Sequence, residues 1–105
     1  MSKLIEVTDA TFEADVLKSS VPVAVDFFGD HCGPCRILKP ILESLAEAIG
    51  DKGKIVAVNV AGSERLVLEY GISAVPSILV FRGGREVRRM VGLAGLGELR
   101  ELLGA

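Results

Sequence analysis

Short continuous runs of apolar residues alternate along the chain with longer stretches in which apolar residues recur at helical spacing. The short runs predict strands, at residues 4–7, 21–28, 55–60, 78–81 and 86–91. The run 21–28 is apolar on both faces, which is typical of a parallel strand buried in a sheet. Gly83-Gly84 separates the last two runs and predicts a hairpin there.

Helices are predicted between these strands. Thr8 or Asp9 can cap the first helix, and the longest follows Cys32 and ends at Gly50. Pro40 lies inside this long helix and is expected to kink its axis. A short helix is predicted over 63–71, before the last helix of the chain. The apolar stripes of the other three helices are Phe12, Val16 and Leu17 in the first, Ile37, Leu38, Ile41, Leu42, Leu45 and Ile49 in the long helix, and Leu96, Leu99, Leu102 and Leu103 in the last.

The element order βαβαβαββα predicts an α/β fold in which the early strands are parallel and the last two form an antiparallel hairpin. The 105 residues, 50% of them hydrophobic, suit a single domain, expected to span 1–105. A formal net charge of −2 with interspersed acids and bases argues against nucleic-acid or membrane partners. Glu6 and Asp9 interrupt the apolar start of the chain, so we expect no targeting segment and a reducing, cytoplasmic location.

Both cysteines of the chain lie in Cys32-Gly33-Pro34-Cys35, between the buried strand and the longest helix. Unpaired N–H groups and the positive end of the dipole at a helix start stabilise a thiolate, which is the nucleophilic form of cysteine. After Cys32 has attacked a disulfide in a partner, Cys35 on the next helical turn can attack the mixed disulfide and release reduced product. The spacing therefore favours thiol–disulfide exchange.

Other uses of the two thiols are less well supported by the pattern. A structural disulfide that closes so short a loop removes little chain entropy. A structural zinc site normally needs four ligands, and Cys32, Cys35 and His31 supply at most three from one chain. A metal ion shared between two chains remains an alternative, but we expect none. Because the chain has no G-x-G-x-x-G dinucleotide fingerprint, we also expect no bound cofactor and a separate source of electrons.

Taken together, these features resemble the thioredoxin family over nearly the whole chain. The matching segments are Val25-Asp26-Phe27, Cys32-Gly33-Pro34-Cys35, Pro40, Tyr70-Gly71-Ile72, Val75-Pro76-Ser77, the Gly83-Gly84 turn and Val91-Gly92. The resemblance implies the thioredoxin fold, a central mixed sheet with helices on both faces, and a cis Val75–Pro76 peptide bond beside the cysteines. It also implies a monomeric protein disulfide reductase that acts on protein disulfides and receives electrons from a separate thioredoxin reductase.

Asp26 and Pro76 take specific roles in this interpretation. Asp26 lies in an otherwise apolar strand, so its carboxyl should be desolvated and its pKa raised. It could then accept a proton from Cys35, directly or through a water molecule. The alternative is an acid that faces solvent at a strand end. Pro76 is either a simple strand-entry proline or, as the family implies, leaves the backbone before it free to pair with an extended substrate. The implied substrate groove is formed by His31, Gly33, Pro34, Ala74, Val75, Pro76 and Gly92.

The chain departs from the family pattern beside the cysteines. His31 and Phe28 stand where thioredoxins usually have tryptophan. A cationic imidazole would favour the Cys32 thiolate and make the disulfide more oxidising, which keeps a disulfide oxidase or isomerase as an alternative function. The alternative for His31 is an exposed loop residue that only replaces an aromatic contact surface. A thioredoxin-fold binding module, which uses the groove to hold a partner protein, is a further alternative function. The carboxylate of Asp30 would oppose a cationic His31.

Val58 and a group of four arginines lead to two further expectations. Val58 is assigned to the strand position where the family often has a lysine near the buried acid, so Asp26 would lack that cationic partner and its pKa would rise further. Four arginines bracket the predicted hairpin and form either the solvated side of a strand or a basic partner patch. They are Arg82, Arg85, Arg88 and Arg89.

Overall fold

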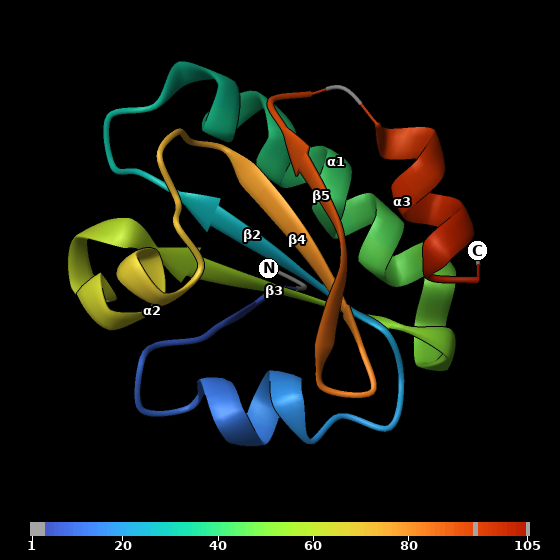
Figure 1. The fold of residues 1–105 in the computed structure, drawn as a ribbon. Coiled ribbons are helices and arrows are strands. Elements are labelled where there is room, and N and C mark those ends of the chain that lie inside the picture. The colour runs from blue at the N-terminus through green and yellow to red at the C-terminus, as the bar shows by residue number, and fades with distance from the viewer. Residues whose placement is uncertain (1–3, 94, 105) are drawn as a thin grey trace.

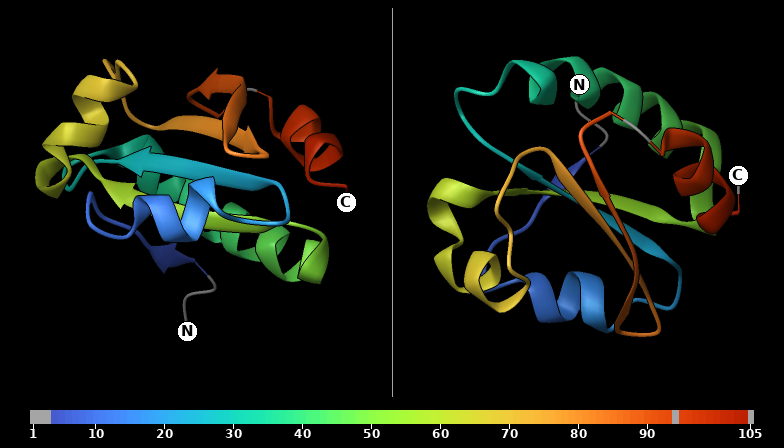
Figure 2. Two further views of the ribbon diagram at one scale, coloured as in Figure 1. Left: turned by 60° about the horizontal axis from the view of Figure 1, so that its bottom comes forward. Right: turned by 45° about the horizontal axis from the view of Figure 1, so that its top comes forward.

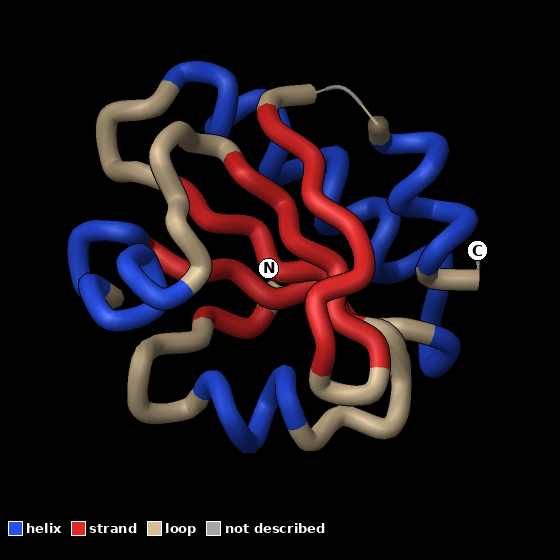
Figure 3. Tube along the Cα trace, in the orientation of Figure 1, coloured by secondary structure: helices blue, strands red, loops and turns tan. Residues whose placement is uncertain are grey.

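A five-stranded mixed sheet in the order β1-β3-β2-β4-β5 forms the centre of the protein in a computed structural model that describes residues 4–93 and 95–104. The strands are Ile5–Glu6 (β1), Val23–Phe28 (β2), Lys54–Asn59 (β3), Ser77–Arg82 (β4) and Arg85–Val91 (β5). β3 pairs in parallel with β1 and β2, and β4 pairs antiparallel with β2 and β5. The predicted parallel early strands and late hairpin are confirmed. Figure 3 shows the strands in red at the centre of the molecule.

Helices cover both faces of the sheet. They are α1 (Gly33–Ile49), α2 (Glu64–Glu69), α3 (Leu96–Leu102), a π-helical segment Glu13–Leu17, and short 3-10 turns at Gly50–Lys52 and Val60–Gly62. Figures 1 and 2 show α1 and α3 together on one side of the sheet, with α2 and the N-terminal helical segment on the other. Within the described ranges, no helix is long and apolar enough to cross a membrane.

Two separate hydrophobic cores hold these layers together. The alternation of side chains along β2 places Val23, Val25 and Phe27 in one core and Ala24 in the other. The first core, under α2, also contains Val7, Phe12, Val16, Val56, Val58, Leu66, Leu79 and Phe81. The second core, under α1 and α3, also contains Leu38, Leu42, Leu45, Ile49, Ile55, Ile78, Val80, Met90, Leu99 and Leu103. Burial of β2 on both faces confirms its interpretation as a central strand.

Some boundaries and faces differ from the sequence prediction. Ile37 and Ile41 were assigned to the buried stripe of α1, but they are 58% and 40% exposed. The prediction was wrong because the buried face of α1 is narrow and runs through Cys35, Leu38, Leu42, Leu45 and Ile49. Val60 lies outside β3, where the Asn59 side chain accepts a hydrogen bond from Ala61 N–H at 2.9 Å and starts a 3-10 turn. α1 continues through Pro40, and the kink expected there stays a prediction.

The two candidate N-caps of the first helix have different partners. Thr8 Oγ1 accepts a hydrogen bond from Ala10 N–H at 3.2 Å, in the turn before the helical segment. The N-cap of that segment is Phe12, which makes no side-chain capping bond, so the expectation that Thr8 or Asp9 caps it was wrong. Asp9 instead reaches α2: its carboxylate accepts hydrogen bonds from the backbone N–H groups of Arg65 and Leu66 at 3.3 and 3.2 Å. Ser63 precedes α2 without a side-chain capping bond. Asp9 therefore caps a helix that lies 56 residues away in the sequence.

We expect Asp9→Ala to lower the free energy of unfolding by about 1 kcal/mol, because the first N–H groups of α2 would lose their acceptor. Urea unfolding would measure this as a lower midpoint with an unchanged slope. Asp51→Ala, at an exposed position, is the matched control and should shift the free energy by less than about 0.5 kcal/mol. Equal effects of the two substitutions would contradict the capping role.

Candidate active site

Cys32 and Cys35 form a disulfide where β2 leads into α1. Cys32 is the N-cap of this 17-residue helix, and its Sγ accepts a hydrogen bond from Cys35 N–H at 3.1 Å. The two residues are only 8% and 6% exposed. The first-turn N–H groups and the positive end of the helix dipole are thus directed at the Cys32 sulfur. In the reduced protein, the same groups stabilise a Cys32 thiolate.

Asp26 lies on the face of β2 that α1 covers, two residues after Ala24. It is 3% exposed, and its Oδ1 has no hydrogen-bond partner in the part of the chain that the structure describes. Burial raises the pKa of the Asp26 carboxyl to about 7, because the charged form loses its hydration. The expectation of a desolvated acid is confirmed, and the alternative of a solvent-facing acid is wrong.

A pocket of about 370 Å³ is lined by both Asp26 and Cys35. Its lining residues are Leu4, Glu6, Asp26, Phe28, Gly29, Asp30, Cys35, Arg36, Lys39 and Ala57. The pocket is large enough for ordered water, so a proton can pass between Cys35 and the carboxyl through one or more water molecules. The structure thus provides a common space for the two groups that the sequence analysis paired.

The residue opposite Asp26 on β3 is Ala57, which corrects the assignment of Val58 to that position. In the parallel register Asp26 pairs with Ala57, and both line the pocket. Val58 is fully buried in the core on the opposite face of the sheet. A shift of one residue along a strand changes the face, and the assignment erred by that one residue. The conclusion that β3 supplies no cation here is unchanged, since alanine is uncharged.

The loop before β4 lies against the first cysteine. The Val75–Pro76 peptide bond is cis, as the resemblance implied. A Cβ placed on Gly29 would lie 3.5 Å from Val75 Cγ2 and 3.9 Å from Cys32 Cβ, so Val75 and Cys32 flank the same point. Gly92 N–H donates a hydrogen bond to the Pro76 carbonyl oxygen at 2.9 Å. Cys32, Val75, Pro76 and Gly92 are thereby brought together from three separate parts of the chain.

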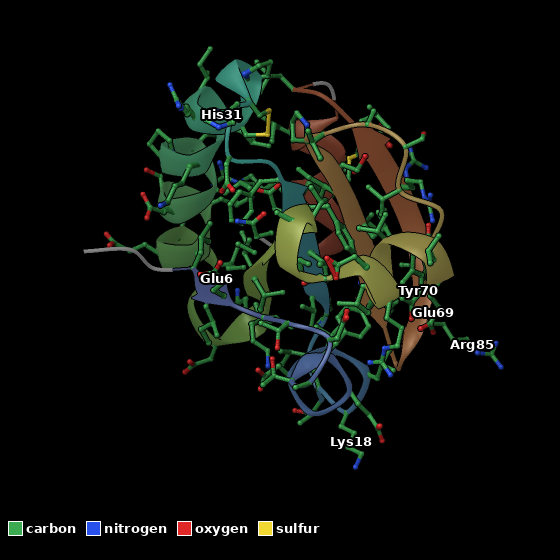
Figure 4. The ribbon with its side chains drawn as sticks, turned by 90° about the vertical axis from the view of Figure 1, so that its left-hand side faces the viewer. Glu6, Lys18, His31, Glu69, Tyr70 and Arg85 are labelled. Carbon is green, nitrogen blue, oxygen red and sulfur yellow. A yellow bond between two sulfur atoms is a disulfide. The ribbon has the colours of Figure 1, made fainter. Side chains whose placement is uncertain are left out.

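The remaining groove residues lie around this centre. Four of the seven predicted positions are exposed, namely His31, Gly33, Pro34 and Ala74. Val75 and Gly92 are half-buried, and Pro76 is buried. Figure 4 shows His31 at the end of the molecule that carries the disulfide. The exposure of His31 fits both an electrostatic role and a contact role, so its two interpretations remain open.

Two polar contacts near the site were not found by sequence reasoning. Ser77 Oγ donates a hydrogen bond to the Ala74 carbonyl oxygen at 2.6 Å. Asn59 Nδ2 donates to Asp30 Oδ1 at 2.9 Å and so links the end of β3 to the loop before Cys32. Ser77 belongs to the Val75-Pro76-Ser77 segment that carried the resemblance, which was the available signal. The Asn59 contact spans 29 residues, and no local pattern indicates it.

Other candidate features contribute little to this site. Three of the four hairpin arginines have partners in the chain: Arg88 pairs with Glu98, Arg89 pairs with Glu86 at 2.8 Å, and Arg82 donates to the Leu102 carbonyl oxygen at 2.6 Å. Figure 4 places Arg85 far from the disulfide end. These contacts favour a solvated strand over a partner patch. Within residues 4–93 and 95–104, no group of three or more His, Cys, Asp or Glu side chains is arranged to hold a metal ion.

Comparisons with known proteins agree with this geometry. A family model described as Thioredoxin matches residues 3–105. Thioredoxin 1 of Nostoc sp. is 41% identical over 92 residues, which cover 88% of this chain and 86% of that protein. The chloroplastic M-type thioredoxin of Chlamydomonas reinhardtii is 45% identical over 86 residues, 82% of this chain and 61% of its own length.

A third relative is also similar over most of its length. The thioredoxin of Rickettsia prowazekii is 38% identical over 87 residues, which cover 83% of each chain. The mixed sheet, the disulfide at the start of α1 and the cis-proline loop beside it are the features that the resemblance implied. The chain therefore belongs to the thioredoxin family and is a thiol–disulfide oxidoreductase.

Proposed function

We propose that this protein reduces disulfides in protein substrates, with Cys32 as the nucleophile and Cys35 as the resolving thiol. The observation that carries this proposal is the Cys32 sulfur at the N-cap of α1, where Cys35 N–H donates to it at 3.1 Å. Charge-assisted hydrogen bonds and the helix dipole favour the thiolate at Cys32 over Cys35, which lies within the helix. Such a thiolate attacks disulfides directly.

The reaction balances over two steps. The Cys32 thiolate attacks one sulfur of the substrate disulfide, forms a mixed disulfide, and expels the other substrate sulfur as a thiolate. Cys35 then gives its proton to the Asp26 carboxylate and attacks the Cys32 sulfur, which releases the second substrate thiolate and leaves the Cys32–Cys35 disulfide. The substrate gains two electrons, and a separate reductase returns two electrons to the protein.

Asp26 suits the role of proton acceptor. A general base works best when its pKa lies near the operating pH, and burial raises the pKa of Asp26 to about 7. The pocket shared with Cys35 gives the proton a route, and Oδ1 has no competing hydrogen bond among the described residues. Val75 and Pro76, adjacent to Cys32, would orient the substrate backbone, with His31, Gly33, Pro34, Ala74 and Gly92 forming the rest of the contact surface.

The wider setting follows from the family and the charge pattern. Thioredoxin-family membership supports protein disulfides as substrates and a reductase as a partner. The monomeric state, the single domain over 1–105, the cytoplasmic location and the specific thioredoxin reductase stay predictions. The net reductive direction of the reaction also stays a prediction.

Cys32→Ser is expected to abolish the dithiothreitol-driven reduction of insulin disulfides, because the attacking sulfur is lost. Turbidity from the released insulin chains measures the rate, and circular dichroism confirms that the variant folds. A folded wild-type protein that gave no acceleration over dithiothreitol alone would overturn the proposal. In that case a thioredoxin-fold binding module would be the better interpretation.

Asp26→Asn is expected to slow the second step by about tenfold or more while it leaves the first attack within about twofold, because only the resolving thiol needs the proton acceptor. Prereduced protein is mixed with excess insulin, quenched with acid, and analysed by mass spectrometry for the mixed disulfide. The variant should accumulate this intermediate. If both steps slowed equally, a role confined to proton transfer would be excluded.

The same substitution has a pH-dependent effect on stability. In the unfolded chain this carboxyl titrates near 3.8, but in the folded protein its pKa is about 7, so the stabilising effect of the protonated carboxyl is lost as the pH rises through about 7. One pKa unit corresponds to about 1.4 kcal/mol, so the loss amounts to roughly 4 kcal/mol. Asp26→Asn should therefore gain stability relative to wild type as the pH rises from about 4 to about 7, and the difference should level off above that range. Urea unfolding of the two oxidised proteins at several pH values measures the difference in their free energies of unfolding. A difference that did not change with pH would contradict the raised pKa of the buried carboxyl.

A further inference from the structure

Ser77 is a buried polar residue that the mechanism above does not use. It is the first residue of β4, directly follows Pro76, and is 4% exposed. Its position is fixed from both sides because it pairs with Phe27 of β2 and with Val91 of β5. From this fixed position its hydroxyl donates a 2.6 Å hydrogen bond to the Ala74 carbonyl oxygen. Ser77 thus connects the sheet to the loop that lies beside Cys32.

A second hydrogen bond holds the other side of the same loop. Gly92 N–H donates to the Pro76 carbonyl oxygen at 2.9 Å, which extends the pairing of β4 and β5 by one step. The carbonyl groups on both sides of Val75 are therefore held by the protein. In the described part of the chain, Val75 itself has no hydrogen bond to its N–H or its carbonyl oxygen. These two groups are the ones left for an external partner.

The free backbone groups of Val75 are adjacent to the redox centre. The Val75 side chain and Cys32 Cβ both approach the position that a Cβ on Gly29 would take, at 3.5 and 3.9 Å. An extended peptide that paired with the Val75 N–H and carbonyl would place its own cysteine next to the Cys32 sulfur. The direction of the Val75 N–H depends on the orientation of the Ala74–Val75 peptide, and that is the peptide whose carbonyl Ser77 holds.

We propose that Ser77 is a positioning residue that selects for peptide-linked disulfides. It fixes the Ala74 carbonyl and thereby orients the Val75 N–H of the same peptide for pairing with an extended segment of a protein substrate. This inference rests on the proposed disulfide reductase function. A small disulfide without peptide groups has no backbone to pair with Val75, so its reduction depends only on access to Cys32.

The test compares Ser77→Thr with Ser77→Val, which have nearly the same shape but differ in the hydroxyl group. Prereduced proteins react with excess insulin or with bis(2-hydroxyethyl) disulfide. Acid-quenched samples are alkylated, and mass spectrometry of the protein measures the loss of its own Cys32 and Cys35 thiols. The readout is the ratio of the two second-order rate constants. Loss of one hydrogen bond predicts a ratio lower by about three- to tenfold in Ser77→Val, whereas Ser77→Thr should stay within about twofold of wild type.

Two controls separate the possible failures. Ser63→Ala removes the hydroxyl of a serine that is also buried, at 1% exposure, but that lies directly before α2 and not at the start of β4. Its ratio should equal that of wild type. Cys32→Ser tests the proposed function: if it still reduced both substrates, the disulfide reductase mechanism itself would fail. If Cys32→Ser were inactive while Ser77→Val, folded by circular dichroism, kept the wild-type ratio, only the role of Ser77 would be overturned.

Discussion

The packing of α1 against the sheet is the interaction on which the site depends. Leu38, Leu42, Leu45 and Ile49 lie in one core with sheet residues such as Ile55 and Ile78. Burial of such a side chain contributes about 1.5–3 kcal/mol, whereas a charge at a helix terminus gains about 0.3–1 kcal/mol. The core therefore decides where α1 lies, and the electrostatics of Cys32 follow from that position. The N–H groups that stabilise the thiolate are held in place before any substrate arrives.

The same core contains the group that opposes folding. Asp26 occupies a position on β2 that an aliphatic residue would fill without cost, and its Oδ1 finds no hydrogen bond within the residues described. The ionised carboxylate is destabilising there, which is the same physical fact as its pKa of about 7. The protein thus keeps a base that is useful near neutral pH at the expense of stability. The neighbouring Ala57 is small, and this leaves the pocket that connects the carboxyl to Cys35.

Hydrogen bonds from side chains to the backbone hold both ends of the segment between α2 and β4 in place. Asp9 holds the start of α2 from a distant loop, and Ser77 holds Ala74 close to the start of β4. The cis-proline loop lies between these two attachments and carries few hydrogen bonds of its own. This arrangement leaves free backbone groups at the place where a substrate needs them and keeps the flanking chain in register.

The sequence by itself determined the element order, the buried strand, the position of both cysteines at a helix start and the desolvation of Asp26. These follow from local spacing and from the presence of one acid in an apolar run, and both kinds of signal lie within a few neighbouring residues. The tertiary structure decided which residue faces Asp26. Ala57 and Val58 differ by one position, and only the pairing of β2 with β3 fixes which of them shares its face.

Contacts between distant segments were likewise decided by the tertiary structure alone. Asp9 is a plausible cap for its own helix in the sequence, but it caps α2 because folding brings the two loops together. Ile37 and Ile41 have helical spacing, yet they are exposed because the sheet covers only part of the circumference of α1. Local patterns specify what each segment can form, whereas the partner of each side chain depends on which segments the cores bring into contact.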